Sequence, residues 1–213
     1  IYRDDYKQSF RPLWISNQAK AFFAYWGQVM LMSATLPRAP VLSRLYGIPE
    51  DAIFEYEVPS VFPVEHRLIY VKPIAKMTRG TVDVSLPKII PAIDRILAGY
   101  PDKKTLIHSH SNTLRDKIRG MISSAHRSRL MWYDGPTRAQ AIRAFTETKE
   151  PKVMIAPSME SGVDIPDLTV QILPKVLYPT LGDPWIRKRA DEWPEWYTWM
   201  TVSNMIQAIG RAP

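Results

Sequence analysis

Short apolar runs of strand length alternate with helical patterns through the middle of this chain, and that alternation constrains the fold most strongly. Helical patterns over 90–99, 111–124 and 137–148 separate successive runs. Strands and helices that alternate at this spacing imply right-handed crossovers and a parallel sheet. The sequence therefore predicts an α/β fold. The runs expected to form strands are 29–33, 53–58, 67–73, 105–110, 130–134, 152–157 and 169–175.

Capping and breaking residues set the expected helix ends. Ser111 is a favourable N-cap, and Thr137 opens a helix directly after the turn signal Asp-Gly-Pro. Pro91 suits the first turn of a helix that stops at Gly99. A last amphipathic helix is expected to begin at Pro194.

The expected domain organisation is one α/β domain with a short leading segment. A length of 213 residues suits a single domain with some additions. Residues 1–28 are rich in aromatic side chains and show no strand pattern, so we expect them to be the tail of a preceding or inserted segment. The α/β domain is expected over 29–213.

Composition excludes several classes of protein. The chain has no cysteine, which excludes a disulfide framework, a zinc ribbon and an iron–sulfur cluster within these residues. No apolar run approaches the roughly 18 residues that a membrane helix needs. The first ten residues have mixed charge and do not resemble a signal peptide. We therefore expect a cytoplasmic protein without a membrane partner.

The charge distribution suits a phosphate-rich partner. The formal net charge is +7, from 28 Lys and Arg against 21 Asp and Glu. Nine basic residues between Lys103 and Arg143 face only Asp116 and Asp134 in that stretch. Binding to a nucleic acid would release counterions from its phosphates and favour the complex. A solvated face of amphipathic helices is the alternative interpretation of the same charges.

Polar stretches follow four of the expected strands. In open α/β sheets, working residues gather at the carboxyl ends of the strands, so these stretches should line one edge. They read HSHSN after 105–110, DGPT after 130–134, PSMESGVD after 152–157 and PKVLYPTLGDP after 169–175.

Four stretches of the sequence, taken in chain order, resemble known motifs. LMSATLP (31–37), TLIHSHSN (105–112), APSMESGVDIPD (156–167) and QAIGRAP (207–213) resemble motifs III, IV, V and VI of superfamily 2 helicases. The segments ESGVDIPD, LPKVLYPTLGDPWIRKRAD and WYTWMTVSNMIQAIGRAP are similar to the XPD/DinG (Rad3-like) group. The resemblance covers about residues 29 to 213 and implies the second RecA-like lobe of a helicase. It departs from the family pattern in HSH, where motif IV usually has an aromatic residue and Ser, and at the second Arg of motif VI, which would fall just past Pro213.

The resemblance implies roles in an ATP site that two lobes share. Arg211 would place its guanidinium on the γ-phosphate, and Gln207 would order water or phosphate oxygens. ATP and Mg²⁺ would be held mainly by an N-terminal lobe. The nucleotide-binding positions implied in this chain are Glu160, Gly162, Asp164 and Gly210.

The resemblance also implies single-stranded DNA as a partner. The expected contacts are Ser33, Thr35, Ser109, Ser111, Asn112, Lys175, Trp185, Arg187 and Lys188. Trp185 could stack a base, as aromatic residues do on single-strand tracks, or belong to the core. Ser33 and Thr35 could couple nucleotide state to strand contacts or form a simple turn cap. His108 and His110 have no apparent third ligand, so no metal site is expected.

These residues contain neither a G-x-x-x-x-G-K-[ST] phosphate loop nor a Walker B Asp-Glu pair. The leading hypothesis is therefore one lobe of an ATP-dependent DNA helicase, monomeric and of bacterial or phage origin, inactive on its own. An iron–sulfur cluster is possible only outside this chain. A non-catalytic RecA-like binding module for nucleic acid or protein, and an unrelated α/β enzyme such as a glycosyltransferase lobe, remain alternatives.

Overall fold

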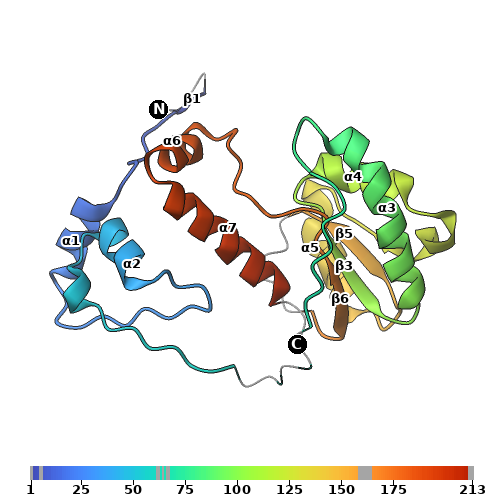
Figure 1. The fold of residues 1–213 in the computed structure, drawn as a ribbon, viewed down its shortest axis with the longest axis horizontal. Helices are drawn as coiled ribbons and strands as arrows, with labels where there is room; N and C mark the ends of the chain where they lie inside the picture. The colour runs from blue at the N-terminus through green and yellow to red at the C-terminus, as the bar shows by residue number, and fades with distance from the viewer. Residues whose placement is uncertain are drawn as a thin grey trace. The chain divides into compact units, whose positions relative to one another are not determined.

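The structure, a computed structural model, describes residues 2–4, 7–60, 63, 65, 68–157 and 165–210 (Figure 1). The chain divides into two compact units, which are considered separately. Unit 1 comprises Ile1–Pro59 and Tyr178–Ser203, and unit 2 comprises Ser60–Leu177 and Asn204–Pro213. Residues 29–59 thus group with 1–28, whereas the sequence predicts a boundary at residue 28.

Unit 2 contains a four-stranded parallel sheet with the order β4-β5-β3-β6. The predicted α/β class and helix-flanked parallel sheet are confirmed, and the arrangement is consistent with a RecA-like sheet. The predicted runs 105–110, 130–134, 152–157 and 169–175 all overlap strands, and each strand is shorter than its run. The elements of unit 2 are α3 (Val82–Gly99), β3 (Lys104–His108), α4 (Asn112–Met121), η3 (Ser124–Arg129), β4 (Leu130–Met131), η4 (Gly135–Thr137), α5 (Arg138–Glu147), β5 (Val153–Ala156), β6 (Leu168–Ile172) and the end of α7 (Pro194–Ile209).

The two faces of the sheet are covered by different helices. Ile107 and Ile155 point to the face where α3 and α4 pack. Their neighbours Leu106 and Met154 point to the opposite face, against Phe145 of α5. Side chains alternate between faces along a strand, so each strand of the sheet interior is apolar on both sides. The helices that connect β3 to β4 and β4 to β5 therefore lie on opposite faces (Figure 1).

Helix α3 begins earlier than predicted, at Val82, and contains two prolines in its interior. Each proline costs roughly 3 kcal/mol in a helix interior. Pro87 and Pro91 both lie on the exposed side, where water can satisfy the carbonyls that lose their partners. The opposite side buries Leu86, Ile89, Ile90, Ile93 and Leu97. At roughly 1.5–3 kcal/mol for each buried aliphatic side chain, burial outweighs the prolines.

Three runs predicted as strands are not strands. Residues 29–33 and 53–58 and the described part of 67–73 have no regular secondary structure and pair with no described strand. Their apolar side chains are exposed: Phe54 is 90% exposed, Tyr70 84% and Met32 84%. A run of β-forming residues becomes a strand only where a neighbour accepts and donates its backbone hydrogen bonds.

Unit 1 is helical around a cluster of aromatic residues. Leu45, Trp193 and Trp196 are buried at its centre, and Trp14 and Trp185 pack against them. The predicted start of the last helix at Pro194 is confirmed. Residues 2–4 and 7–9, which lie in a segment predicted to lack strands, form a short antiparallel pair. The elements of unit 1 are β1 (Tyr2–Asp4), β2 (Lys7–Ser9), α1 (Ser16–Phe23), α2 (Ala39–Tyr46), η1 (Glu50–Ala52), α6 (Pro184–Glu192) and the first turns of α7.

No helix among the described residues is long and apolar enough to cross a membrane.

Arg129 holds the amino-terminal side of the sheet together. Its guanidinium donates to the carbonyl oxygens of Pro151 (2.7 Å), Lys103 (2.9 Å), Leu97 (3.2 Å) and Tyr100 (3.2 Å). These oxygens belong to the end of α3 and to the segments that lead into β3 and β5. One side chain thus fixes three chain segments relative to one another.

We expect Arg129→Met to lower the free energy of unfolding of unit 2 by about 3 kcal/mol, because several carbonyls lose a charged donor. Urea unfolding followed by far-UV circular dichroism measures the change. Arg127→Ala is the matched control, since Arg127 is an exposed arginine two residues away and should change stability by no more than about 0.5 kcal/mol. Equal stability of the two variants would contradict the role given to Arg129.

Candidate functional site

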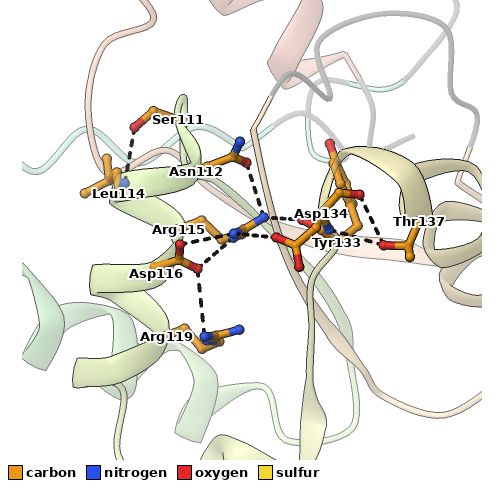
Figure 2. Close-up of polar contacts among 9 residues, drawn as sticks. All are labelled: Ser111, Asn112, Leu114, Arg115, Asp116, Arg119, Tyr133, Asp134 and Thr137. Atoms are coloured by element: carbon orange, nitrogen blue, oxygen red, sulfur yellow. Dashed lines mark hydrogen bonds and ion pairs between the residues drawn. The ribbon is translucent and has the colours of Figure 1, made fainter.

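The segment after β3 turns sharply into helix α4. Ser109 is fully buried, and its backbone N–H donates to the Ala156 carbonyl at 2.9 Å. His110 has a left-handed backbone (φ 62°), and the Ser111 N–H returns to the Ser109 carbonyl at 2.7 Å. The Ser111 hydroxyl accepts from the Leu114 N–H at 3.2 Å, so its predicted N-cap role is confirmed (Figure 2). The hydroxyl of Ser109 has no hydrogen-bond partner among the described residues.

Arg115 connects this turn to the segment that follows β4. Its buried guanidinium donates to Asp134 (3.0 Å), Asn112 (3.2 Å), both carboxylate oxygens of Asp116 (3.0 and 3.1 Å) and the Tyr133 carbonyl oxygen (Figure 2). The hydrogen bond to Asp116 is the main cause that raises the pKa of Arg115 above its ordinary value. Asn112, predicted to contact DNA, therefore has its side-chain oxygen engaged within the fold.

Sequence reasoning missed Arg115 as a structural residue and counted it only as a positive charge. The signal available was its position on α4, next to Leu114 and three residues before Ile118, both of which are buried with it. An arginine on the buried side of a short helix needs internal acceptors, because an unpaired buried charge is costly.

Tyr133 ties the end of β4 to the end of β5. Its hydroxyl donates to the Pro157 carbonyl at 2.5 Å. The residues that directly follow, 158–164, lie outside the described part of the chain, and they include the predicted nucleotide-binding residues Glu160, Gly162 and Asp164.

Gln171 on β6 joins the sheet to the end of helix α7. Its amide nitrogen donates to the Ile209 carbonyl at 2.8 Å, and its amide oxygen lies 3.0 Å from Nε2 of His108 on β3. Because the Gln171 oxygen can only accept, Nε2 of His108 carries the hydrogen. The last turn of α7 thus lies at the carboxyl ends of β3 and β6.

The position of this last turn brings Gln207 and Gly210, two residues of the predicted ATP site, to the sheet edge that carries Ser109. Gln207 is exposed on the last turn of α7, and the Gly210 N–H closes the helix on the Ile206 carbonyl at 2.9 Å. Asn204 also anchors this turn, donating to the Leu177 carbonyl at 3.2 Å. Arg211 lies outside the described residues.

Lys175 follows β6 and is half-buried. Burial lowers the pKa of its ammonium group. The ammonium group makes no hydrogen bond or ion pair with another described residue, which leaves it available to an anionic ligand.

The remaining predicted residues belong to unit 1, and each has an internal partner. The Thr35 N–H donates to the Ser33 hydroxyl at 3.1 Å, the geometry of a turn cap. Arg187 donates to the Leu181 carbonyl at 2.9 Å. Lys188 pairs with Glu192 at 3.1 Å.

Trp185 lies in the aromatic cluster of unit 1. Its indole N–H donates to the Pro12 carbonyl at 2.8 Å. The guanidinium carbons of Arg11 and Arg189 lie 3.6 and 4.2 Å from its ring centroid. At these distances the two guanidinium groups leave little room for the stacked base that the sequence predicts at Trp185.

The basic surplus between Lys103 and Arg143 is largely engaged inside the fold. Arg115 and Arg129 are bound as described above, and buried Lys104 lies 3.3 and 3.4 Å from two carbonyl oxygens. Carboxylates from outside that stretch of sequence pair with others. The pairs are Lys103 with Asp102, Lys117 with Asp83 and Arg143 with Glu147. Counting charge along the sequence therefore overstates the charge available to a partner.

No protein-family model matches the chain, and the search of curated proteins gives no significant match.

We expect the free energy of unfolding of Asp116→Asn to change less with falling pH than that of the native protein. The Arg115 hydrogen bond lowers the pKa of the Asp116 carboxyl below its ordinary value of 3.8. A lowered folded-state pKa adds stability that is fully present above the unfolded pKa and is lost as pH falls through the folded pKa. The urea midpoint of the native protein should therefore fall below about pH 4 more steeply than that of the variant.

Asp191→Asn, at an exposed aspartate with no described ion pair, is the control and should keep the native pH dependence. If the urea midpoints of the native protein and of Asp116→Asn fell equally steeply below about pH 4, the contact between Asp116 and Arg115 would not be maintained in solution.

Proposed function

We propose that this chain is the second motor lobe of an ATP-dependent DNA helicase of the XPD/DinG type, which translocates on single-stranded DNA. In this proposal the chain supplies motifs IV, V and VI to an ATP site shared with an N-terminal lobe. That lobe holds most of the ATP and the Mg²⁺.

The link through Gln171 is the observation that carries the proposal. The sequence stretch read as motif VI begins in the last turn of α7, and the 2.8 Å bond to Ile209 holds that turn at the carboxyl edge of β3 and β6. Ser109, in the stretch read as motif IV, lies at the same edge. Ligands of open α/β sheets bind outside the carboxyl ends of the strands, so the two motifs converge where a nucleotide would be expected.

The proposed catalytic residues lie in the sequence at and directly after the end of α7. Gly210 closes α7 at this edge, and Arg211 is the next residue. A guanidinium there would present a planar fork to the charge that develops on a transferring phosphoryl group. Gln207, one helical turn earlier and exposed, would order the attacking water. Glu160, Gly162 and Asp164 would complete the site from the segment after β5.

A second observation supports a lobe beyond these residues. Met30 and Met32 are 80% and 84% exposed on either side of Leu31, in the run 29–33, which overlaps the start of the proposed motif III (31–37). Exposed apolar residues in a strand-forming run are expected where another part of a sheet normally pairs with it. We propose that the N-terminal lobe provides that pairing.

Single-stranded DNA would cross the same edge of unit 2. Lys175 provides a cation that makes no hydrogen bond or ion pair with another described residue, whereas the hydroxyl of Ser109 is buried at this edge. Since much of the remaining positive charge is paired internally, we expect the lobe alone to bind DNA weakly and with a steep salt dependence.

Arg211→Ala in the full-length protein should reduce DNA-stimulated ATP turnover by about 10³-fold or more, by analogy with arginine fingers. Arg211→Lys should recover little, because a point charge cannot reproduce the fork. Gln207→Ala should also lose turnover. The chain of 213 residues alone should show no ATP hydrolysis.

Arg127→Ala removes the same charge from an exposed site and should retain native turnover. If Arg211→Ala also retains it, motif VI has no catalytic role here. If the native full-length protein binds DNA without hydrolysing ATP, the chain is the non-catalytic binding module considered as the alternative.

A further inference from the structure

Arg189 lies among three tryptophans in unit 1. Its guanidinium carbon is 4.2 Å from the ring centroid of Trp185, 4.4 Å from that of Trp14 and 4.5 Å from that of Trp196. The residue is 7% exposed. Contacts with ring faces attract a cation, but they use the flat face of the guanidinium and none of its N–H groups.

No carboxylate neutralises this buried cation among the described residues. Its Nε has no hydrogen-bond partner there. Glu192, three residues after Arg189 on α6, accepts from the Trp14 indole at 2.8 Å and pairs with Lys188 at 3.1 Å. Buried arginines are normally paired, because an isolated buried charge is costly.

A second guanidinium adds to the same unbalanced charge. Arg11 lies 3.6 Å from the Trp185 centroid and also makes no ion pair with a described residue. Burial, and next the positive charge of Arg11, lower the pKa of Arg189 to about 10, so Arg189 remains charged at neutral pH. Two like charges on one indole ring are unfavourable unless an anion sits near both.

We propose that Arg11 and Arg189, held in place by Trp14, Trp185 and Trp196, form a binding site for a phosphate group. Stacking on indoles fixes both guanidinium planes in advance, so little side-chain entropy is lost when their N–H edges bind an oxyanion. Phosphate accepts several such bonds at once and carries the charge that the cluster lacks. In this site Trp185 positions the two arginines and does not stack a base. The site does not depend on the helicase assignment or on ATP.

The phosphate could belong to a nucleic-acid backbone or to a free anion, and two probes separate these sources. Binding of a fluorescein-labelled thymidine 12-mer is followed by anisotropy at several salt concentrations, and binding of inorganic pyrophosphate by calorimetry. Arg11→Ala should weaken binding of at least one probe about tenfold, as expected for one charge-assisted hydrogen bond. It should also lower the salt slope for the oligonucleotide by about 1 if the backbone is the ligand.

The controls separate a phosphate contact from a general loss of charge or fold. Arg127→Ala removes an exposed arginine outside the cluster and should leave both affinities within twofold of native. Arg189→Lys keeps the charge but not the fork, and should lose affinity in step with Arg11→Ala while its circular dichroism stays native. A loss for the oligonucleotide alone assigns a backbone phosphate, and a loss for pyrophosphate alone assigns a free anion. The proposal is overturned if neither probe binds the native protein, or if Arg11→Ala and Arg127→Ala bind both probes equally.

Discussion

The amide of Gln171 is the contact on which the proposed site depends. It accepts from one neighbouring element and donates to another, so His108 on β3, β6 itself and the last turn of α7 are fixed by one side chain. An amide is suited to this position because it is uncharged and has both a donor and an acceptor. The hydrogen bond from Asn204 to the Leu177 carbonyl and the burial of Ala208 also hold this end of α7.

Arginine side chains act as structural connectors throughout the protein. Arg129 binds four carbonyl oxygens at the amino-terminal side of the sheet, and Arg115 joins the segments after β3 and β4 at the opposite side. In unit 1, Arg189 is packed among indole rings instead. A guanidinium can serve all these purposes because it has five donors in one plane and two flat faces. The positive charge of the sequence is thus partly a consequence of how the fold is held together.

The sequence was most informative where local pattern and tertiary context agree. The strands β3 and β5 are buried along their whole length, so their apolar runs have one stable outcome. Ser111 caps α4 because its cap needs only neighbouring residues. The runs over 29–33 and 53–58 have the same local pattern but pair with no strand in the described part of the chain, so pattern alone predicted strands that are not found there. The roles of Gln171 and Arg115 could not be predicted, because each depends on residues far away in the chain that only the fold brings near.

The absence of cysteine makes a direct distance measurement straightforward. Spin labels can be attached to cysteines introduced at Thr113 on α4 and Ile206 on α7, both exposed and both in unit 2. Double electron–electron resonance then reports how firmly the end of α7 is held at the carboxyl edge of the sheet. We predict a single narrow distance distribution, which Gln171→Leu broadens. A broad distribution with Gln171 intact would contradict the account, because motif VI would then have no fixed place at the proposed site.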